Sequence, residues 1–145
     1  MKIHLIDVNV LVALFDESHE HHELCLNWCK KIGFQIAICP IVENGLLRIC
    51  SHPKYPNNPS SFHEIMDFLL DLRMNTNSLF IYDTYSFSKS LSLRHKFDIP
   101  SKYITDAYLL QLAVQEDMLF STLDRRIPND ILGKNKSRVI GLLNS

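Results

Sequence analysis

The stretch Leu5–Asp16 reads LIDVNVLVALFD and predicts a strand that leads directly into a helix. The preceding run from Ile3 to Ile6 is short and mostly apolar, as buried strands are. Asp7 ends this strand, and the apolar residues Val8–Phe15 suit a buried helix with Asp7 at its N-cap position. This strand-to-helix turn predicts an α/β fold with a carboxylate at the end of a strand.

The rest of the chain continues the alternation of strands and helices. We expect further strands at 34–38, 79–81, 119–121 and 139–143, and helices at 19–32, 40–50, 61–72, 85–95 and 105–116. This order predicts a single domain over residues 1–145 with a three-layer α/β/α fold and a central, mostly parallel sheet of about four to five short strands. Ligands of such folds bind beyond the carboxyl ends of the strands.

Glu43 lies within the expected helix Pro40–Cys50, in a position that should face the core. Steps of three and four residues from Glu43 reach Leu46, Leu47 and Cys50, which form the apolar stripe of that helix. A carboxylate is rarely buried unless it is paired with a cation or bound to a metal. We therefore expect another part of the fold to compensate the charge of Glu43.

Two more acids lie near expected strand ends or helix starts. Asp106 falls in the first turn of the helix that Thr105 should cap, and Asp124 falls in the turn after the strand at 119–121. Taken singly, the aspartates have ordinary explanations, since Asp is common at N-caps, in first helical turns and in turns. Together with Glu43 they should converge on one edge of the sheet, with Asn9 and Thr105 as supporting polar residues.

Four carboxylates this close together would raise one another's pKa unless they shared a cation. Ligand sets made only of oxygen select hard dications, so we expect Mg²⁺, with Mn²⁺ able to substitute, rather than zinc. Such a site suits hydrolysis of a phosphodiester bond by metal-activated water. The expected catalytic and metal-binding residues are Asp7, Glu43, Asp106 and Asp124.

Composition and charge restrict the class of protein without naming a function. The 145 residues are 46% hydrophobic, which is ordinary for a globular protein, and no apolar run approaches a membrane span. The N-terminal segment lacks the features of a signal peptide, so we expect a cytoplasmic protein. The net charge of −1 gives no sign of nucleic-acid binding by itself. Local basic groups still offer phosphate contacts, namely Lys54, Arg125 and Arg126.

Four segments together resemble a PIN-domain ribonuclease, and more narrowly a VapC-type toxin of a bacterial toxin–antitoxin pair. They read LIDVNVLVALFD at 5–16, CPIVENGLLRICSHP at 39–53, ITDAYLLQLAV at 104–114 and FSTLDRRI at 120–127. They occur in the family's order and span essentially the whole chain. By this resemblance, the four acids of the family fall on Asp7, Glu43, Asp106 and Asp124, and its small polar residue falls on Asn9.

The resemblance implies a PIN-like fold and a Mg²⁺-dependent endoribonuclease that acts as the toxin of a type II toxin–antitoxin pair. It further implies a VapB-like antitoxin as partner and a homodimer, and it leaves the RNA target open. Two other interpretations remain: a housekeeping PIN nuclease without an antitoxin, and a module that binds RNA without cutting it.

Histidines and cysteines in and before the helix expected at 19–32 allow a different metal site. His19, His21 and His22 precede Cys25 and Cys29, but this spacing matches no usual zinc motif. We expect the histidines to form a solvated helix end and the cysteines to be buried, reduced thiols.

Overall fold

The computed structural model describes residues 2–89, 98–125 and 127–143. Arg126 and most of the helix expected at 85–95 lie outside the described residues. The described part of that segment forms a short 3₁₀ helix, η1, at Phe87–Lys89.

Within the described residues, five short strands form one parallel sheet, which confirms the predicted architecture. They are β1 (His4–Ile6), β2 (Ile36–Ile38), β3 (Leu79–Phe80), β4 (Leu119–Thr122) and β5 (Val139–Gly141), in the spatial order β3-β2-β1-β4-β5. The chain proceeds from β1 outward to β3 and then crosses to β4 on the other side of β1. The direction of winding therefore reverses between β1 and β4, and such a switch point is where α/β folds bind ligands.

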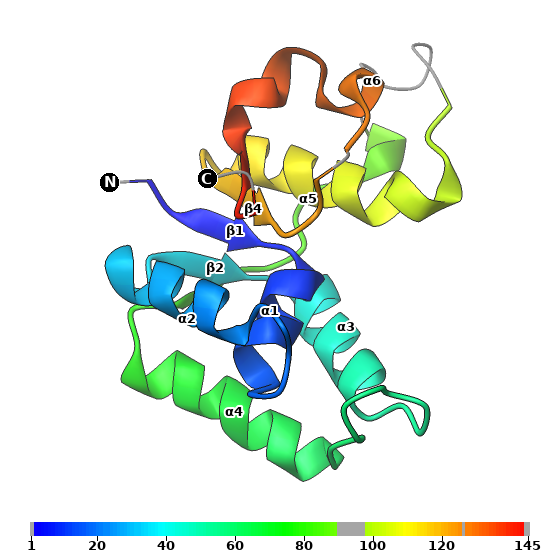
Figure 1. Ribbon diagram of the computed structural model, residues 1–145. Helices are drawn as coiled ribbons and strands as arrows, with labels where there is room; N and C mark the ends of the chain where they lie inside the picture. The colour runs from blue at the N-terminus through cyan, green and yellow to red at the C-terminus, as the bar shows by residue number, and fades with distance from the viewer. Residues whose placement is uncertain (1, 90–97, 126, 144–145) are drawn as a thin grey trace.

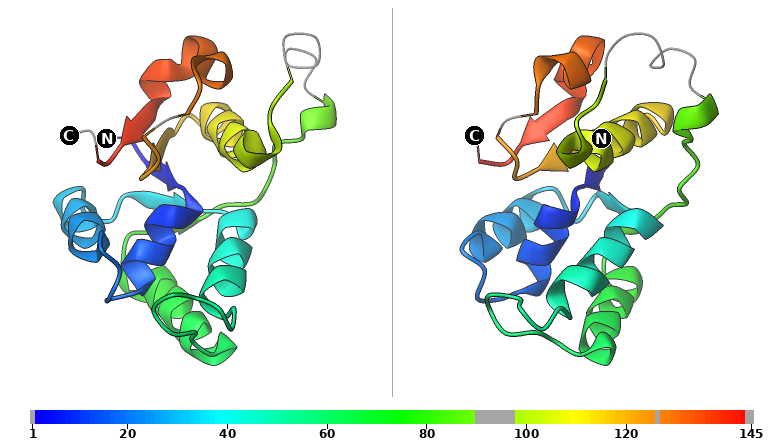
Figure 2. Two further views of the ribbon diagram at one scale, coloured as in Figure 1. Left: turned by 45° about the vertical axis from the view of Figure 1, so that its right-hand side comes forward. Right: turned by 90° about the vertical axis from the view of Figure 1, so that its right-hand side faces the viewer.

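Helices cover both faces of this sheet (Figures 1 and 2). One face carries α1 (Val8–Phe15), α2 (His22–Lys31), α3 (Pro40–Cys50) and α4 (Phe62–Asn75). The other face carries α5 (Ile104–Gln115), which follows the 3₁₀ helix η2 (Ser101–Tyr103), together with α6 (Asn129–Leu132) and the 3₁₀ helix η3 (Gly133–Arg138). In the described part of the chain, no helix has the length and apolar character needed to cross a membrane.

Local sequence signals explain most of these boundaries. Asp7 caps α1, and Pro40 occupies the first turn of α3, where its missing N–H costs nothing. Ser61 and Glu64 form a capping box at the start of α4. The expectation that Thr105 caps its helix is wrong: α5 already begins at Ile104, because η2 leads straight into it, and no side chain caps it.

The four cysteines and one of the histidines lie in the interior. All four cysteines are free and buried, as predicted, and burial raises the pKa of the Cys29 and Cys39 thiols to about 12. The expected solvated histidine cluster is only partly right, since His22 is buried and its Nδ1 donates to the carbonyl of Ala13 at 2.7 Å. This bond ties the start of α2 to α1.

Gly45 sets how closely α3 approaches α1. A Cβ atom added at Gly45 would lie 2.6 Å from Cγ2 of Val8, and the β-branched Val8 has few alternative rotamers. We expect Gly45→Ala to lower the free energy of unfolding by about 1–3 kcal/mol, even though Ala favours the helix over Gly. Thermal denaturation measures the effect, and the matched variant Gly45→Ala/Val8→Ala should recover most of the loss. Unchanged stability of the single variant would contradict the close approach of the two helices.

Candidate active site

Three of the four predicted acids come together at the switch point of the sheet. Asp7 directly follows β1, Asp124 lies just beyond β4, and β1 and β4 are neighbours. Asp106 lies in the first turn of α5. All three line one pocket of about 270 Å³. The same pocket is lined by Asn9 and Thr105, the two residues expected to support the acids.

Asp7 is held firmly in this pocket. Its Oδ1 accepts a hydrogen bond from the backbone N–H of Val8 at 2.7 Å, and its Oδ2 accepts one from the hydroxyl of Thr122 at 2.8 Å. Its own backbone N–H donates to the carbonyl of Ser121 at 2.9 Å. Asp7 is therefore both the N-cap of α1 and a wall of the pocket, so the two explanations that the sequence allowed are compatible.

Asn9 positions the turn that carries Asp124. Its Nδ2 lies 3.3 Å from Oγ1 of Thr122, and its Oδ1 accepts from the backbone N–H of Leu123 at 3.2 Å. Oγ1 of Thr122 in turn accepts from the backbone N–H of Asp124 at 2.9 Å. The small polar residue two positions after Asp7 thus links α1 to the end of β4.

The acids influence one another electrostatically. Burial, together with the negative charges of Asp7 and Asp124, raises the pKa of Asp106 to about 7. Burial also raises the pKa of Asp7, against hydrogen bonds from Thr122 and Val8 that favour its ionised form. The interaction between the two side chains lowers the pKa of Asp7 and raises that of Asp106. The raised pKa of Asp106 therefore reflects both its burial and the two carboxylates beside it.

Glu43 differs from the expectation in its environment. The buried residues of α3 are Val42, Gly45, Leu46 and Cys50, and Glu43 borders this face as a half-buried side chain. It does not line the acidic pocket. Among the described residues, no three acidic, histidine or cysteine side chains already stand as a ready-made metal site. The roles of Glu43 and of the three aspartates as metal ligands therefore stay predictions.

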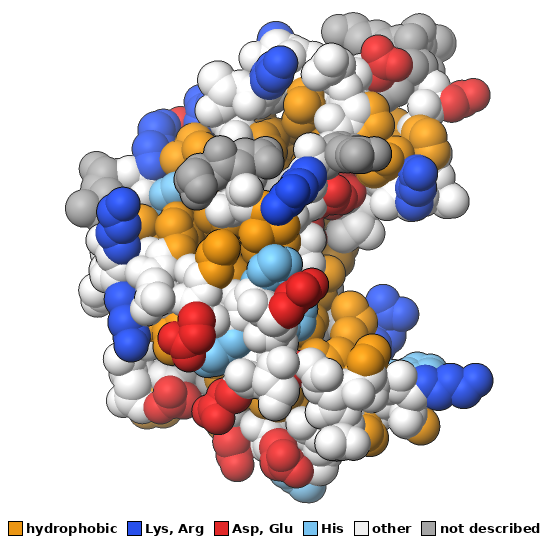
Figure 3. Space-filling view, in the orientation of Figure 1, with side chains coloured by type: hydrophobic (Ala, Val, Ile, Leu, Met, Phe, Trp, Pro, Cys, Tyr) orange, Lys and Arg blue, Asp and Glu red, His pale blue; other side chains and the backbone are white. Residues whose placement is uncertain are grey.

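The pocket is also lined by two basic residues, Arg48 of α3 and Lys102 of η2. Neither of them was expected at the site from the sequence. Figure 3 shows the surface hollowed on the side where α3 faces the start of α5, with basic side chains on both sides of the opening. A signal for Arg48 exists in the sequence, because Ile41, Gly45 and Arg48 recur at helical spacing on the face of α3 that lines the pocket. Lys102 lies four residues before Asp106 in the sequence, but it reaches the pocket only because η2 leads directly into α5.

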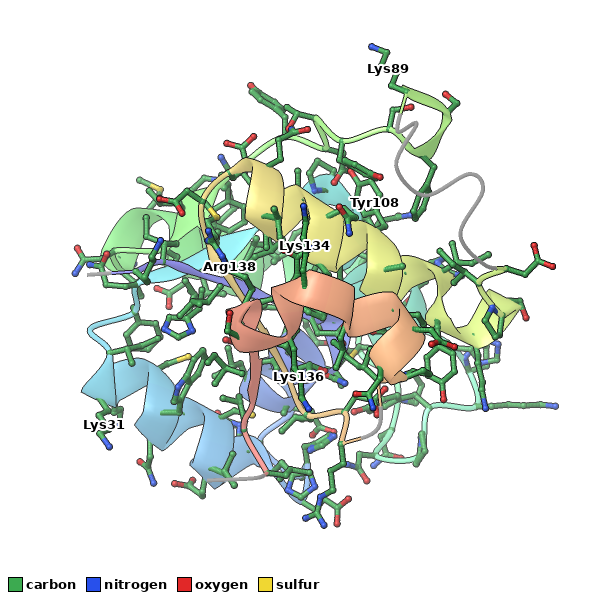
Figure 4. All side chains as sticks on the ribbon, turned by 90° about the horizontal axis from the view of Figure 1, so that it is seen from above. Lys31, Lys89, Tyr108, Lys134, Lys136 and Arg138 are labelled. Atoms are coloured by element: carbon green, nitrogen blue, oxygen red, sulfur yellow. The ribbon has the colours of Figure 1, made fainter. Side chains whose placement is uncertain are left out.

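The other basic residues lie elsewhere. Lys54 lines a neighbouring hollow, Arg125 is exposed beside Asp124, and Arg126 lies outside the described residues. The basic run of η3 does not form one patch, since Lys134, Lys136 and Arg138 point in different directions (Figure 4). Arg138 pairs with Asp117 at 3.0 Å, at the end of the sheet opposite the acids.

Comparison with known proteins identifies the family of this chain. Residues 4–129 match the family model described as PIN domain. Ribonuclease VapC44 of Mycobacterium tuberculosis (strain ATCC 25618 / H37Rv) is 40% identical over 125 residues, which cover 85% of this chain and 87% of that protein. Ribonuclease VapC38 of the same strain is 31% identical over 83% of this chain and 84% of its own length. Ribonuclease VapC29 of that strain is 28% identical over the same shares of the two chains.

Proposed function

Since the chain belongs to the PIN-domain family and to its VapC-type ribonucleases, we propose that it is a metal-dependent endoribonuclease and the toxin of a type II toxin–antitoxin pair. The observation that carries this proposal is the group formed by Asp7, Asp106 and Asp124 at the switch point of the sheet. Asp7 and Asp124 raise the pKa of Asp106, because like charges in one pocket repel each other. A bound cation would offset this repulsion, so the arrangement is typical of a cation-binding site.

The residues of the pocket fit Mg²⁺ or Mn²⁺. Every acidic group that lines it offers carboxylate oxygen, the ligand that hard dications prefer. Asp7 and Asp106 would hold the ion, with Asp124 and Glu43 completing its surroundings. When bound, Mg²⁺ would activate water and neutralise charge on the phosphate.

The protein's own groups would orient the RNA. Arg48 and Lys102 flank the acids and carry the positive charge that a phosphodiester backbone requires. Asp7 would keep its direction through Val8 and Thr122, and Asn9 would keep Asp124 in place through the turn after β4. RNA hydrolysis at this site would leave a 5′-phosphate and a 3′-hydroxyl.

Incubation of the purified protein with RNA tests this proposal. We expect new RNA ends in the presence of Mg²⁺ or Mn²⁺, no cleavage in EDTA, and recovery when either ion is added back in excess. Retention of RNA without new ends would instead identify a binding module. Cleavage that continues unchanged in EDTA would contradict the metal requirement.

The toxin role and the partners are part of the same proposal. A VapB-like antitoxin would cover the acidic groove, and the protein would act as a homodimer. Co-expression with the antitoxin encoded beside this gene should suppress cleavage, and light scattering of the free protein should give the mass of two chains. A gene with no antitoxin neighbour would favour the housekeeping nuclease.

A further inference from the structure

A second hollow adjoins the acidic pocket along α3. It has a volume of about 430 Å³, and its lining is mostly apolar. Cavities of about 300–1,000 Å³ are typical of small-molecule sites, so this one is large enough for a nucleoside-sized group. Its walls come from the end of α3 and the segment that follows: Arg48, Ile49, His52, Lys54, Tyr55 and Pro56.

The two cavities are continuous, because Arg48 and Ile49 line both of them. Helix geometry explains this: Arg48 and Ile49 follow Gly45 by three and four residues, so all three lie on one side of α3. A chain molecule with one phosphate at the acids would therefore meet Arg48 next and then enter the second hollow.

The segment 51–60, which forms part of this wall, is held in place by hydrogen bonds to the end of α1. The buried Asp16, at the C-cap of α1, accepts from the hydroxyl of Tyr55 at 2.5 Å and from Nδ2 of Asn57 at 2.8 Å. Burial alone would raise the pKa of Asp16, but these bonds and one from Ser18 hold it below its ordinary value. A cavity that is already formed loses less conformational entropy when a ligand binds.

The chemistry of the hollow suits a nucleotide. Ile49, Pro56 and the ring of Tyr55 offer apolar surface to the flat faces of a base, while Arg48 and Lys54 offer charge to a phosphate. Within the described residues, neither Arg48 nor Lys54 forms a salt bridge. His52 accepts the backbone N–H of Lys54 at its Nδ1, so its neutral ring carries the proton on Nε2 and offers a donor.

The hollow also limits how much RNA can follow this path. Beyond Tyr55 and Pro56 lies another cavity, and within the described residues its lining includes no Arg or Lys side chain that could hold a further phosphate. A base must also leave its stack to enter an apolar cavity, which paired RNA does not allow. These features favour a single unpaired nucleotide.

We propose that the hollow between Arg48 and Pro56 binds the base of one unpaired RNA nucleotide next to the scissile phosphate, and that Arg48 and Lys54 hold the adjoining backbone. The hollow is thus a specificity-determining subsite. This inference rests on the proposed ribonuclease function and extends it to the choice of cleavage site.

The test uses the shortest single-stranded RNA that spans a cleavage site mapped with the wild-type protein. Its nucleotides are replaced one at a time by abasic ones, and binding to the Asp106→Asn protein in Mg²⁺ is measured by fluorescence anisotropy. Removal of one base next to the cleavage site should weaken binding about tenfold, as loss of a stacked base does. The added substitutions Ile49→Ala and Pro56→Ala should abolish the effect at that position alone.

Two lysines provide a matched comparison for the backbone contact. Adding Lys54→Ala should weaken the binding of every RNA and make that binding less dependent on salt concentration. Lys31 lies on the exposed surface of α2, so adding Lys31→Ala should change neither the affinity nor its salt dependence. Equal abasic effects with and without Ile49 and Pro56 would overturn the subsite while leaving the nuclease intact. Absence of any RNA cleavage by the wild-type protein would instead overturn the proposed function, and the subsite with it.

Discussion

Replacement of Asp106 by Asn is expected to reduce RNA cleavage by about 1,000-fold and, at the same time, to stabilise the metal-free protein above neutral pH. The loss of activity follows from the loss of a charged ligand, because a bound dication supplies several kcal/mol of transition-state stabilisation and each 1.36 kcal/mol is tenfold in rate. The gain in stability follows from removing a buried charge that Asp7 and Asp124 disfavour.

These opposite signs distinguish a functional acid from a structural one. An acid that only supported the fold would lose stability and activity together when replaced. Asp67→Asn is the matched control, because Asp67 is an exposed residue of α4, on the sheet face opposite to α5. Initial rates of RNA cleavage and thermal melts of the three proteins make the comparison. Cleavage by Asp106→Asn near the wild-type rate would contradict the assigned site.

The melting temperature of the metal-free wild type, measured relative to that of Asp106→Asn, is expected to fall by roughly 5–10 °C when the pH rises from about 5 to about 8. The pKa of Asp106 is about 7 in the folded protein and near 3.8 when unfolded. Between these values the folded protein binds more protons, so its stability is present at low pH and is lost as the pH rises through 7. His4, whose pKa burial lowers, acts in the opposite sense and is common to both proteins.

Magnesium should reverse this loss. A ligand that binds only the folded protein stabilises it, and protons compete with the cation for the same carboxylates. Mg²⁺ should therefore raise the melting temperature of the wild type more at pH 8 than at pH 5, and should raise that of Asp106→Asn much less. Scanning calorimetry across this range, with and without Mg²⁺, measures both effects. If Mg²⁺ raised the melting temperature equally in the two proteins, the ion would have to bind at a site that does not include Asp106.

Much of the fold was predictable because its signals are local. The helix Val8–Phe15 and the N-cap role of Asp7 agree with the structure residue by residue, since capping and apolar spacing act within one turn. The start of α5 was harder to predict from the sequence, because η2 leads into Ile104 and no side chain of the described residues caps the helix. Glu43 shows the limit of periodicity, since steps of three and four residues place it near the buried face of α3 but do not say which side of that face it borders.

The sequence by itself determined the order of strands and helices, the parallel sheet, and the positions of Asp7, Asp106 and Asp124 near the ends of these elements. Only the tertiary structure decided that the chain crosses from β3 to β4 beside β1, and so which side chains meet there. Arg48 and Lys102 join the acids, and a second hollow opens beside them, through contacts between segments far apart in the chain. The physical reason is that propensity acts over a few residues, whereas the packing of the whole sheet fixes which surfaces face one another.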